Sequence, residues 1–169
     1  WDIGDAIYKS LETHQLAKGA DHALDAQRED AILAAAQGYF DLAKAQAAVG
    51  VAEEAVRISR DYEDQINHAV EAGIAFKGDA LRVRVQTQRN ELLLRQTKEQ
   101  QRIAASRLAE TLHLDSTVEL TATDTDLIPI SLVNADTALE FFVQQALTSR
   151  PELKQSKALY VAARDAKNG

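Results

Sequence analysis

Several residue types are absent or scarce in this chain. It contains no Cys, which excludes a disulfide framework, a thiolate metal site and a Cys nucleophile. Only two Pro and seven Gly occur among 169 residues, so there are few positions that would stop a helix. Aromatic residues make up 5%, too few for a core of large rings. The longest uninterrupted apolar run has six residues, at 31–36, so no predicted helix spans a bilayer.

The residues that are abundant favour long helices. Ala, Glu, Lys, Leu and Arg supply nearly half of the chain, a bias typical of long helices and coiled coils. The formal net charge is −7, and the basic residues are scattered. Such a chain is unsuited to the phosphate backbone of nucleic acids. The chain begins at Trp1 and has no Met, so we expect it to be part of a longer protein.

The first half of the chain predicts one long helix. No Pro interrupts the segment from Asp5 to Ala72, and small or apolar residues recur in it at intervals of three and four. This spacing, held over many turns, indicates a helix with a supercoiling seam. A second apolar stripe beside the seam predicts a second neighbour. The predicted seam consists of Ala31, Ala35, Gly38, Leu42, Ala45, Val49, Ala52, Val56, Ser59, Glu63, Ile66 and Val70. The second stripe consists of Leu33, Phe40, Ala47, Val51, Ala55, Ile58 and Tyr62.

A short turn and a second helix are expected next. Gly73 suits a left-handed helix C-cap, and Asp79 suits the N-cap of a helix over 79–113. A short turn between two long helices predicts an antiparallel helical hairpin. The apolar skeleton expected for the second helix is Leu81, Val85, Leu92, Ile103, Ala109 and Leu112.

A turn centred near residue 75 predicts the pairing of the two helices. Val70 should then face Leu81, Ile66 should face Val85, and Ser59 should face Leu92. Acidic residues of the first helix should lie near basic residues of the second. The expected neighbours are Glu71 with Arg82, Asp61 and Asp64 with Arg89, and Glu53 and Glu54 with Lys98.

The last third of the chain changes character. Thr117–Thr121 alternates and is rich in β-branched residues, which predicts a short strand, and 124–131 reads as loop. Two short helices are expected at 136–148 and 151–167, opened by capping boxes at Thr137 and Ser149. The predicted fold is therefore mostly all-α, with three segments. They are a long helical hairpin over 1–114, a strand and loop over 115–133, and short helices over 134–169.

No pattern in the sequence indicates catalysis. Carboxylates are dispersed at helical spacing, as on a solvated helix face, and no nucleophile elbow or phosphate-binding glycine motif occurs. The four histidines lack a metal-ligand spacing. We therefore expect that the protein is not an enzyme and that it has no catalytic residue, no metal site and no cofactor. The histidines are His14, His22, His68 and His113.

The predicted turn is the one feature beyond plain helix. It places two bulky apolar residues, Ile74 and Phe76, in a short loop that cannot fold back into a core. An ordinary helix–helix connection is one interpretation, and a docking surface is the other. The predicted tip consists of Ala72, Gly73, Ile74, Ala75, Phe76, Lys77, Gly78 and Asp79.

Four stretches resemble one known family in the same order. Residues 36–46 (AQGYFDLAKAQ) are similar to the AYFDLLxAQ stretch of the TolC-type outer-membrane efflux and secretion channels. Residues 72–81 (AGIAFKGDAL) resemble the tip of that family's helical hairpin, and 108–114 (LAETLHL) the end of its second helix. Residues 146–153 (ALTSRPEL) resemble the opening of its next repeat.

The resemblance implies a fold and a function. In this family three protomers form one continuous β-barrel and α-barrel, and each protomer has two repeats. By resemblance the chain is the periplasmic segment between the two membrane hairpins of a homotrimer in the outer membrane of a Gram-negative bacterium. The channel would passively export drugs, metals or proteins received from an inner-membrane transporter, as in multidrug efflux and type I secretion. A periplasmic adaptor would dock at residues 72–79.

The alternative is a coiled-coil scaffold or interaction module without a pore. Both interpretations predict the same hairpin, with no nucleic acid as a partner. They differ in what lies beside it: membrane strands for the channel, or other folded domains for the scaffold.

Overall fold

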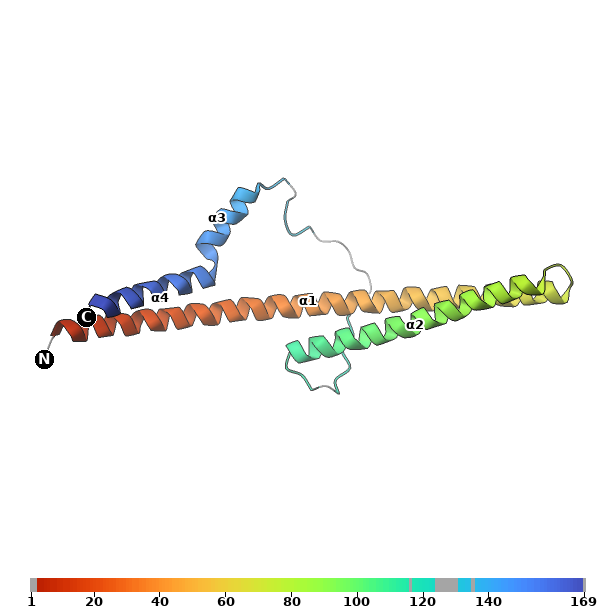
Figure 1. Cartoon of the computed structure of the whole chain (residues 1–169), viewed down its shortest axis with the longest axis horizontal. Helices are drawn as coiled ribbons and strands as arrows, with labels where there is room; N and C mark the ends of the chain where they lie inside the picture. The colour runs from red at the N-terminus through yellow and green to blue at the C-terminus, as the bar shows by residue number, and fades with distance from the viewer. Residues whose placement is uncertain (1–2, 116, 124–130, 135, 169) are drawn as a thin grey trace. The chain divides into compact units, whose positions relative to one another are not determined.

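The computed structural model describes residues 3–115, 117–123, 131–134 and 136–168. Within these residues the chain forms four helices, α1 (Ile3–Glu71), α2 (Lys77–Thr111), α3 (Leu139–Ser149) and α4 (Pro151–Asn168) (Figure 1). The mostly all-α fold with a long helical hairpin is thereby confirmed. The chain packs as two units, one within 34–128 and the other within 1–33 and 129–169, and α1 contributes to both.

Helix α1 is unbroken over 69 residues, as the absence of Pro predicts. It begins two residues before the expected Asp5 and ends one residue before the expected Ala72. At 1.5 Å per residue it is roughly 100 Å long. In the described part of the chain, no helix combines the length and the apolar character that crossing a bilayer requires.

The predicted seam of α1 is the face that α2 covers. Leu42, Val49, Ala52 and Val56 are buried, and the remaining seam residues from Ala35 to Val70 are half-buried. The seam prediction is therefore confirmed from Ala35 onward. Ala31 is exposed, so the seam does not extend to it.

The face of α2 that meets this seam is not the one expected. Of the expected skeleton, Ala109 is buried as predicted. The other five residues are exposed, namely Leu81, Val85, Leu92, Ile103 and Leu112. The buried or half-buried positions instead follow their own spacing of three and four, which includes several polar residues. These positions are Ala80, Val83, Thr87, Asn90, Leu94, Thr97, Gln101, Ala104 and Leu108.

Two polar side chains explain why this face of α2, and not the expected apolar one, meets the seam of α1. The hydroxyl of Thr87 donates to the backbone oxygen of Ser59 at 3.3 Å, and it also lies 3.2 Å from the backbone oxygen of Val83. The side-chain amide of Asn90 donates to the backbone oxygen of Ala55 at 3.4 Å. Because helix carbonyls can accept a second hydrogen bond, these polar groups are satisfied inside the seam. Ser59 therefore faces Thr87 and not Leu92.

Ion pairs flank the seam on its exposed sides. Glu53 and Lys98 pair at 2.8 Å, as expected from the sequence. Two further pairs join the helices, Arg60 with Glu91 at 2.6 Å and Arg84 with Glu63 at 3.1 Å. Hydrogen bonding by Thr87 and then by Arg84 holds the pKa of the Glu63 carboxyl below its usual range.

The other expected ion pairs across the hairpin are not found among the described residues, and several of their members pair along their own helices instead. Asp61 pairs with Arg57 at 3.0 Å, and Arg82 pairs with Asp79 at 3.6 Å. Glu71 lies 3.5 Å from His68. Residues three or four apart on a helix are adjacent on its surface, so these local partners compete with those of the opposite helix.

The hairpin unit has a small core near the end of α2. Leu42 and Ala43 of α1 pack there with Leu108 of α2 and with Ala122. A Cβ added to Gly38 would lie 3.1 Å from the Leu108 side chain, so this glycine lets the two helices approach closely. The core is completed at its edges by Tyr39, Ala104, Ala105 and Leu120.

The predicted strand at 117–121 is not formed. Within the described residues 117–123 the chain has no regular secondary structure. The amide of Gln46 anchors this segment, because it donates to the backbone oxygen of Ala122 at 3.3 Å and accepts from its backbone nitrogen at 3.1 Å. A strand needs a partner strand, and here one side chain supplies the pairing. Of the predicted loop over 124–131, only Ser131 lies inside the described residues.

In the second unit, α4 packs on the amino-terminal part of α1. Ala158 and Ala162 are buried, and Gly19 lies against the side chain of Leu159. Pro151 stands at the first position of α4, as predicted. The prediction of a capping box at Ser149 is wrong, because the Ser149 hydroxyl donates to the backbone oxygen of Gln145.

Helix α3 starts three residues later than the expected 136. Its N-cap is Ala138, which has no side-chain acceptor, so the predicted capping box at Thr137 is also wrong. No residue of α3 is buried. Tertiary contacts within the described residues therefore contribute little to this helix.

Shortening Leu42 tests the core of the hairpin. Leu42 is 1% exposed, so Leu42→Ala should lower the free energy of unfolding by about 2–5 kcal/mol. Leu24→Ala is the control, because Leu24 is 59% exposed and its loss should cost well under about 1 kcal/mol. Urea titrations followed by circular dichroism measure both. Equal effects would contradict the assigned core.

Candidate functional site

The predicted tip lies at the turn between α1 and α2. Gly73 has a φ of +75°, the left-handed conformation expected from the sequence. Its backbone nitrogen donates to the oxygen of Val70 at 3.0 Å, and that of Ile74 donates to the oxygen of Ala69 at 2.8 Å. This pair of bonds is a Schellman motif, which satisfies carbonyls that the helix end would leave open.

The second helix begins earlier than predicted. Phe76 is the N-cap of α2, with φ −89° and ψ 146°, and no side chain caps it. The prediction of Asp79 as the N-cap is therefore wrong. Asp79 lies in the first turn, where its negative charge interacts favourably with the positive end of the helix dipole. The turn is thus tighter than expected, with only residues 72–76 between the helices.

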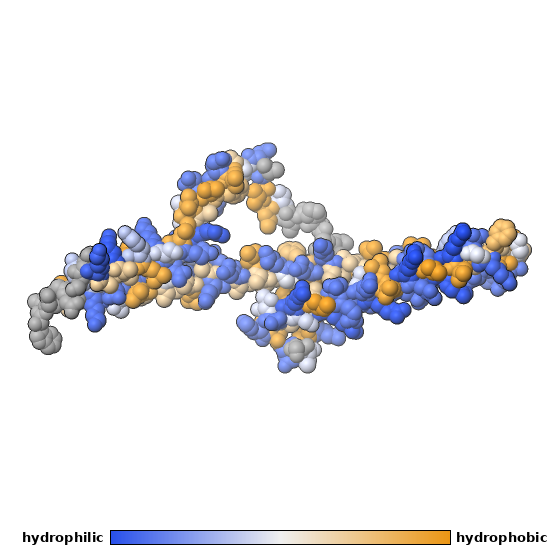
Figure 2. All heavy atoms as spheres, viewed as in Figure 1, coloured by the Kyte–Doolittle hydropathy of each residue, from blue (hydrophilic) through white to orange (hydrophobic). Residues whose placement is uncertain are grey.

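Two apolar side chains at the tip are in solvent. Ile74 is 82% exposed and Phe76 is 81% exposed. Figure 2 shows apolar atoms at this end of the hairpin. Burying one such side chain on a partner contributes about 1.5–3 kcal/mol. The geometry of the tip therefore fits a docking surface better than a connection alone.

Helix α1 has a second exposed apolar surface. The predicted second stripe is present, and within the described residues nothing covers most of it. Val51 is 72% exposed, and Leu33, Phe40, Ile58 and Tyr62 are each more than half exposed. The exposed apolar residues of α2 form a corresponding row, namely Leu81, Val85, Leu92 and Ile103. We call these two rows the outer stripes.

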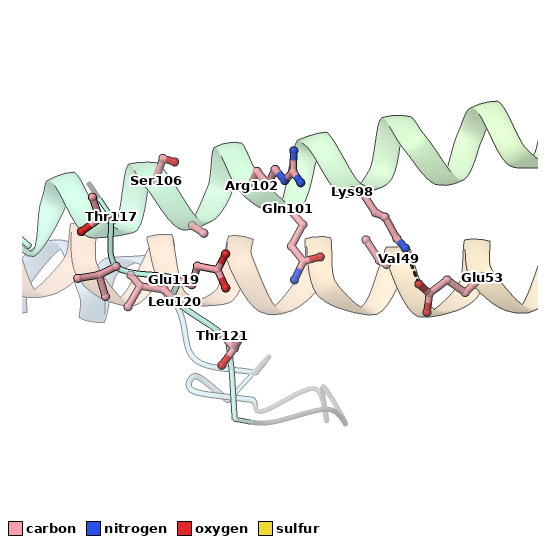
Figure 3. Close-up of a pocket in the computed structure, with 12 residues that line it drawn as sticks. Val49, Glu53, Lys98, Gln101, Arg102, Ser106, Thr117, Glu119, Leu120 and Thr121 are labelled. Atoms are coloured by element: carbon pink, nitrogen blue, oxygen red, sulfur yellow. Dashed lines mark ion pairs between the residues drawn. The ribbon is translucent and has the colours of Figure 1, made fainter. Parts of the chain in front are cut away.

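A cavity of about 610 Å³ lies between the hairpin and the segment 117–121 (Figure 3). Its charged groups include both members of the Glu53–Lys98 ion pair, together with Arg102 and Glu119. Sequence reasoning missed this cavity, since it depends on where the segment returns to α1. The full lining is Val49, Glu53, Lys98, Gln101, Arg102, Ala105, Ser106, Thr117, Val118, Glu119, Leu120 and Thr121.

The cavity has mixed charge and no evident reaction centre. Glu53 and Lys98 form an ion pair at 2.8 Å. In the part of the chain that the structure describes, no three His, Asp or Glu side chains converge to hold a metal ion. The arrangement offers recognition through hydrogen bonds and charge.

The chain matches no known protein-family model, no curated protein and no solved structure.

A substitution at Gly73 tests whether the turn is built on its left-handed backbone. Gly73→Ala should destabilise the hairpin end by about 1 kcal/mol, because L-residues are strained at this φ. Gly78→Ala is a matched control, since no atom would contact the added Cβ and Ala favours a helix. Amide hydrogen exchange of residues 69–80 would report both. Faster exchange in the Gly78 variant alone would contradict the assigned turn.

Proposed function

We propose that this chain is part of the helical wall of a trimeric outer-membrane channel of the TolC type. The channel would passively export drugs, metals or proteins, with an inner-membrane transporter and a periplasmic adaptor as partners. The segment would lie in the periplasm, and it would act mechanically, without catalysis. The sequence resemblance supports this proposal, and so do two features of the hairpin.

The observation that carries the proposal is the pair of outer stripes. Helix α1 buries one stripe against α2 and leaves a second exposed, with Val51 at 72%. A helix in a closed barrel has a neighbour on each side, so it needs two apolar stripes. An isolated hairpin needs only one. The outer stripes therefore suit a wall in which α1 and α2 each pack against a helix of a neighbouring second-repeat hairpin.

The tip suits the docking role. Within the described residues, the side chains of Ile74 and Phe76 are left largely exposed, and the Schellman motif at Gly73 holds their backbone in place. A rigid turn that presents two apolar side chains loses little conformational entropy on binding. Adaptor contact at this point could bias the hairpins toward an open arrangement.

The alternative is a pore-less coiled-coil scaffold, which would also bury the outer stripes. The channel and the scaffold differ in symmetry. In the barrel wall, second-repeat hairpins separate the copies of this hairpin, whereas a two-fold scaffold brings the same helix of two copies together.

Disulfide cross-linking distinguishes these symmetries, because the chain contains no Cys. In the full-length protein, the double variant Ile58→Cys with Leu92→Cys has one thiol on each outer stripe. In the channel both thiols face second-repeat hairpins, so we expect oxidation to give no covalent oligomer, as read on a non-reducing gel. Ile58→Cys or Leu92→Cys alone should stay uncross-linked. Dimers formed by either single variant would support the scaffold and contradict the channel.

A charge at the tip tests the docking role. Phe76→Asp should weaken adaptor cross-linking at least about tenfold, since the burial of Phe is lost. Export by cells should fall with it. Tyr160→Asp is the control, because Tyr160 is a 70% exposed aromatic residue on α4. Unchanged adaptor cross-linking and export in the Phe76 variant would rule out docking at the tip.

A further inference from the structure

A groove lies between α1 and α4. Its volume is about 340 Å³, and all of the residues that line it belong to the unit in which α4 packs on α1. Neither the outer stripes nor the tip contribute to it. The lining consists of Gln15, Lys18, His22, Lys154, Lys157, Ala158 and Val161.

The groove concentrates positive charge. Lys18 and His22 are four residues apart on α1, and Lys154 and Lys157 are three apart on α4, so each pair shares a helix face. Three ammonium groups and an imidazole therefore surround one hollow, and no carboxylate lines it. This stands out in a chain whose net charge is −7.

The bases of the groove also lack acidic partners. In the hairpin, Arg57, Arg60, Arg84 and Lys98 each form an ion pair. None of the groove's four basic residues pairs with an acid within the described residues. Like charges held close together repel one another, and a bound anion would relieve this repulsion.

Among the described residues, the acid that is buried does not line the groove. Asp165 lies on α4 and is buried, but its partner is its neighbour Arg164, with 3.3 Å between Nη2 and Oδ1.

The floor of the groove is apolar. Ala158 is buried and Val161 is half-buried, and both line the groove. An apolar floor lowers the local dielectric constant, which strengthens the attraction between an ammonium group and an anion above it. Gln15 adds an amide that can donate a hydrogen bond.

We propose that this groove binds a phosphate group, carried by a free phosphate compound or by a phospholipid headgroup. A phosphate monoester has nearly two negative charges and three strong acceptor oxygens, whereas the phosphodiester of a phospholipid headgroup has one negative charge and two such oxygens. Lys18, Lys154 and Lys157 supply one ammonium group for each oxygen of a monoester, and each N–H bond to phosphate is charge-assisted. The apolar floor accommodates the carbon atoms next to the phosphate. This inference does not depend on the proposed channel.

Calorimetric titration of the full chain tests the proposal. The probes are inorganic phosphate, pyrophosphate, and vesicles of phosphatidylcholine with and without phosphatidylglycerol. The double variant Lys154→Gln with Lys157→Gln should weaken binding at least about tenfold. Lys9→Gln with Lys167→Gln changes the net charge equally, on exposed positions of the same two helices outside the groove, and should change binding within about twofold.

The two kinds of probe identify the source of the phosphate. Groove-dependent binding of phosphate or pyrophosphate supports a free phosphate compound. Groove-dependent binding of phosphatidylglycerol vesicles alone supports a headgroup. No saturable binding of any probe, or equal loss in the two double variants, would overturn the proposal.

Acetylation of the lysines in the wild-type chain tests the groove without relying on the folding of any variant. In the wild-type chain, the bound probe should protect Lys18, Lys154 and Lys157 from acetylation at least about threefold, as measured by mass spectrometry. Lys9 and Lys167 should react at unchanged rates. Uniform protection of all five lysines, or none, would count against the groove.

Discussion

The close contact between α1 and α2 is the constraint on which the hairpin depends. Small side chains along α1, with Gly38 as the extreme case, let the helices approach, and Leu108 fills the space above Gly38. At this distance the polar residues Thr87 and Asn90 reach backbone carbonyls of α1. Their hydrogen bonds are lost if one helix slides along the other, so they specify the register that the small residues alone would leave open.

This contact also determines what remains exposed. Once α2 covers one stripe of α1, the outer stripes on both helices point away from it, and within the described residues they have no partner. The tip has the same character, because Ile74 and Phe76 lie where neither helix can cover them. A chain with so much ordered apolar surface is suited to assembly, and the proposed barrel uses both surfaces.

Where prediction failed, the reason is physical. The expected face of α2 was chosen for its apolar residues, yet polar Thr87 and Asn90 occupy the seam because their hydrogen bonds are satisfied there. The strand expected at 117–121 depended on β-branched composition, but strand pairing needs a second strand, and Gln46 takes that place. The start of α2 was assigned to Asp79, a better capping residue than Phe76. The Schellman motif ends α1 so abruptly that α2 already begins at Lys77.

The sequence by itself determined the features that repeat or act within a few residues. These are the unbroken length of α1, its seam from Ala35 to Val70, and the turn at Gly73. Only the tertiary structure decided which face of α2 meets that seam, where Gln46 anchors Ala122, and how Lys18 and Lys157 come to share a groove. Helical periodicity is local and can be counted along the chain. Contacts between residues far apart in sequence depend on distances that spacing does not encode.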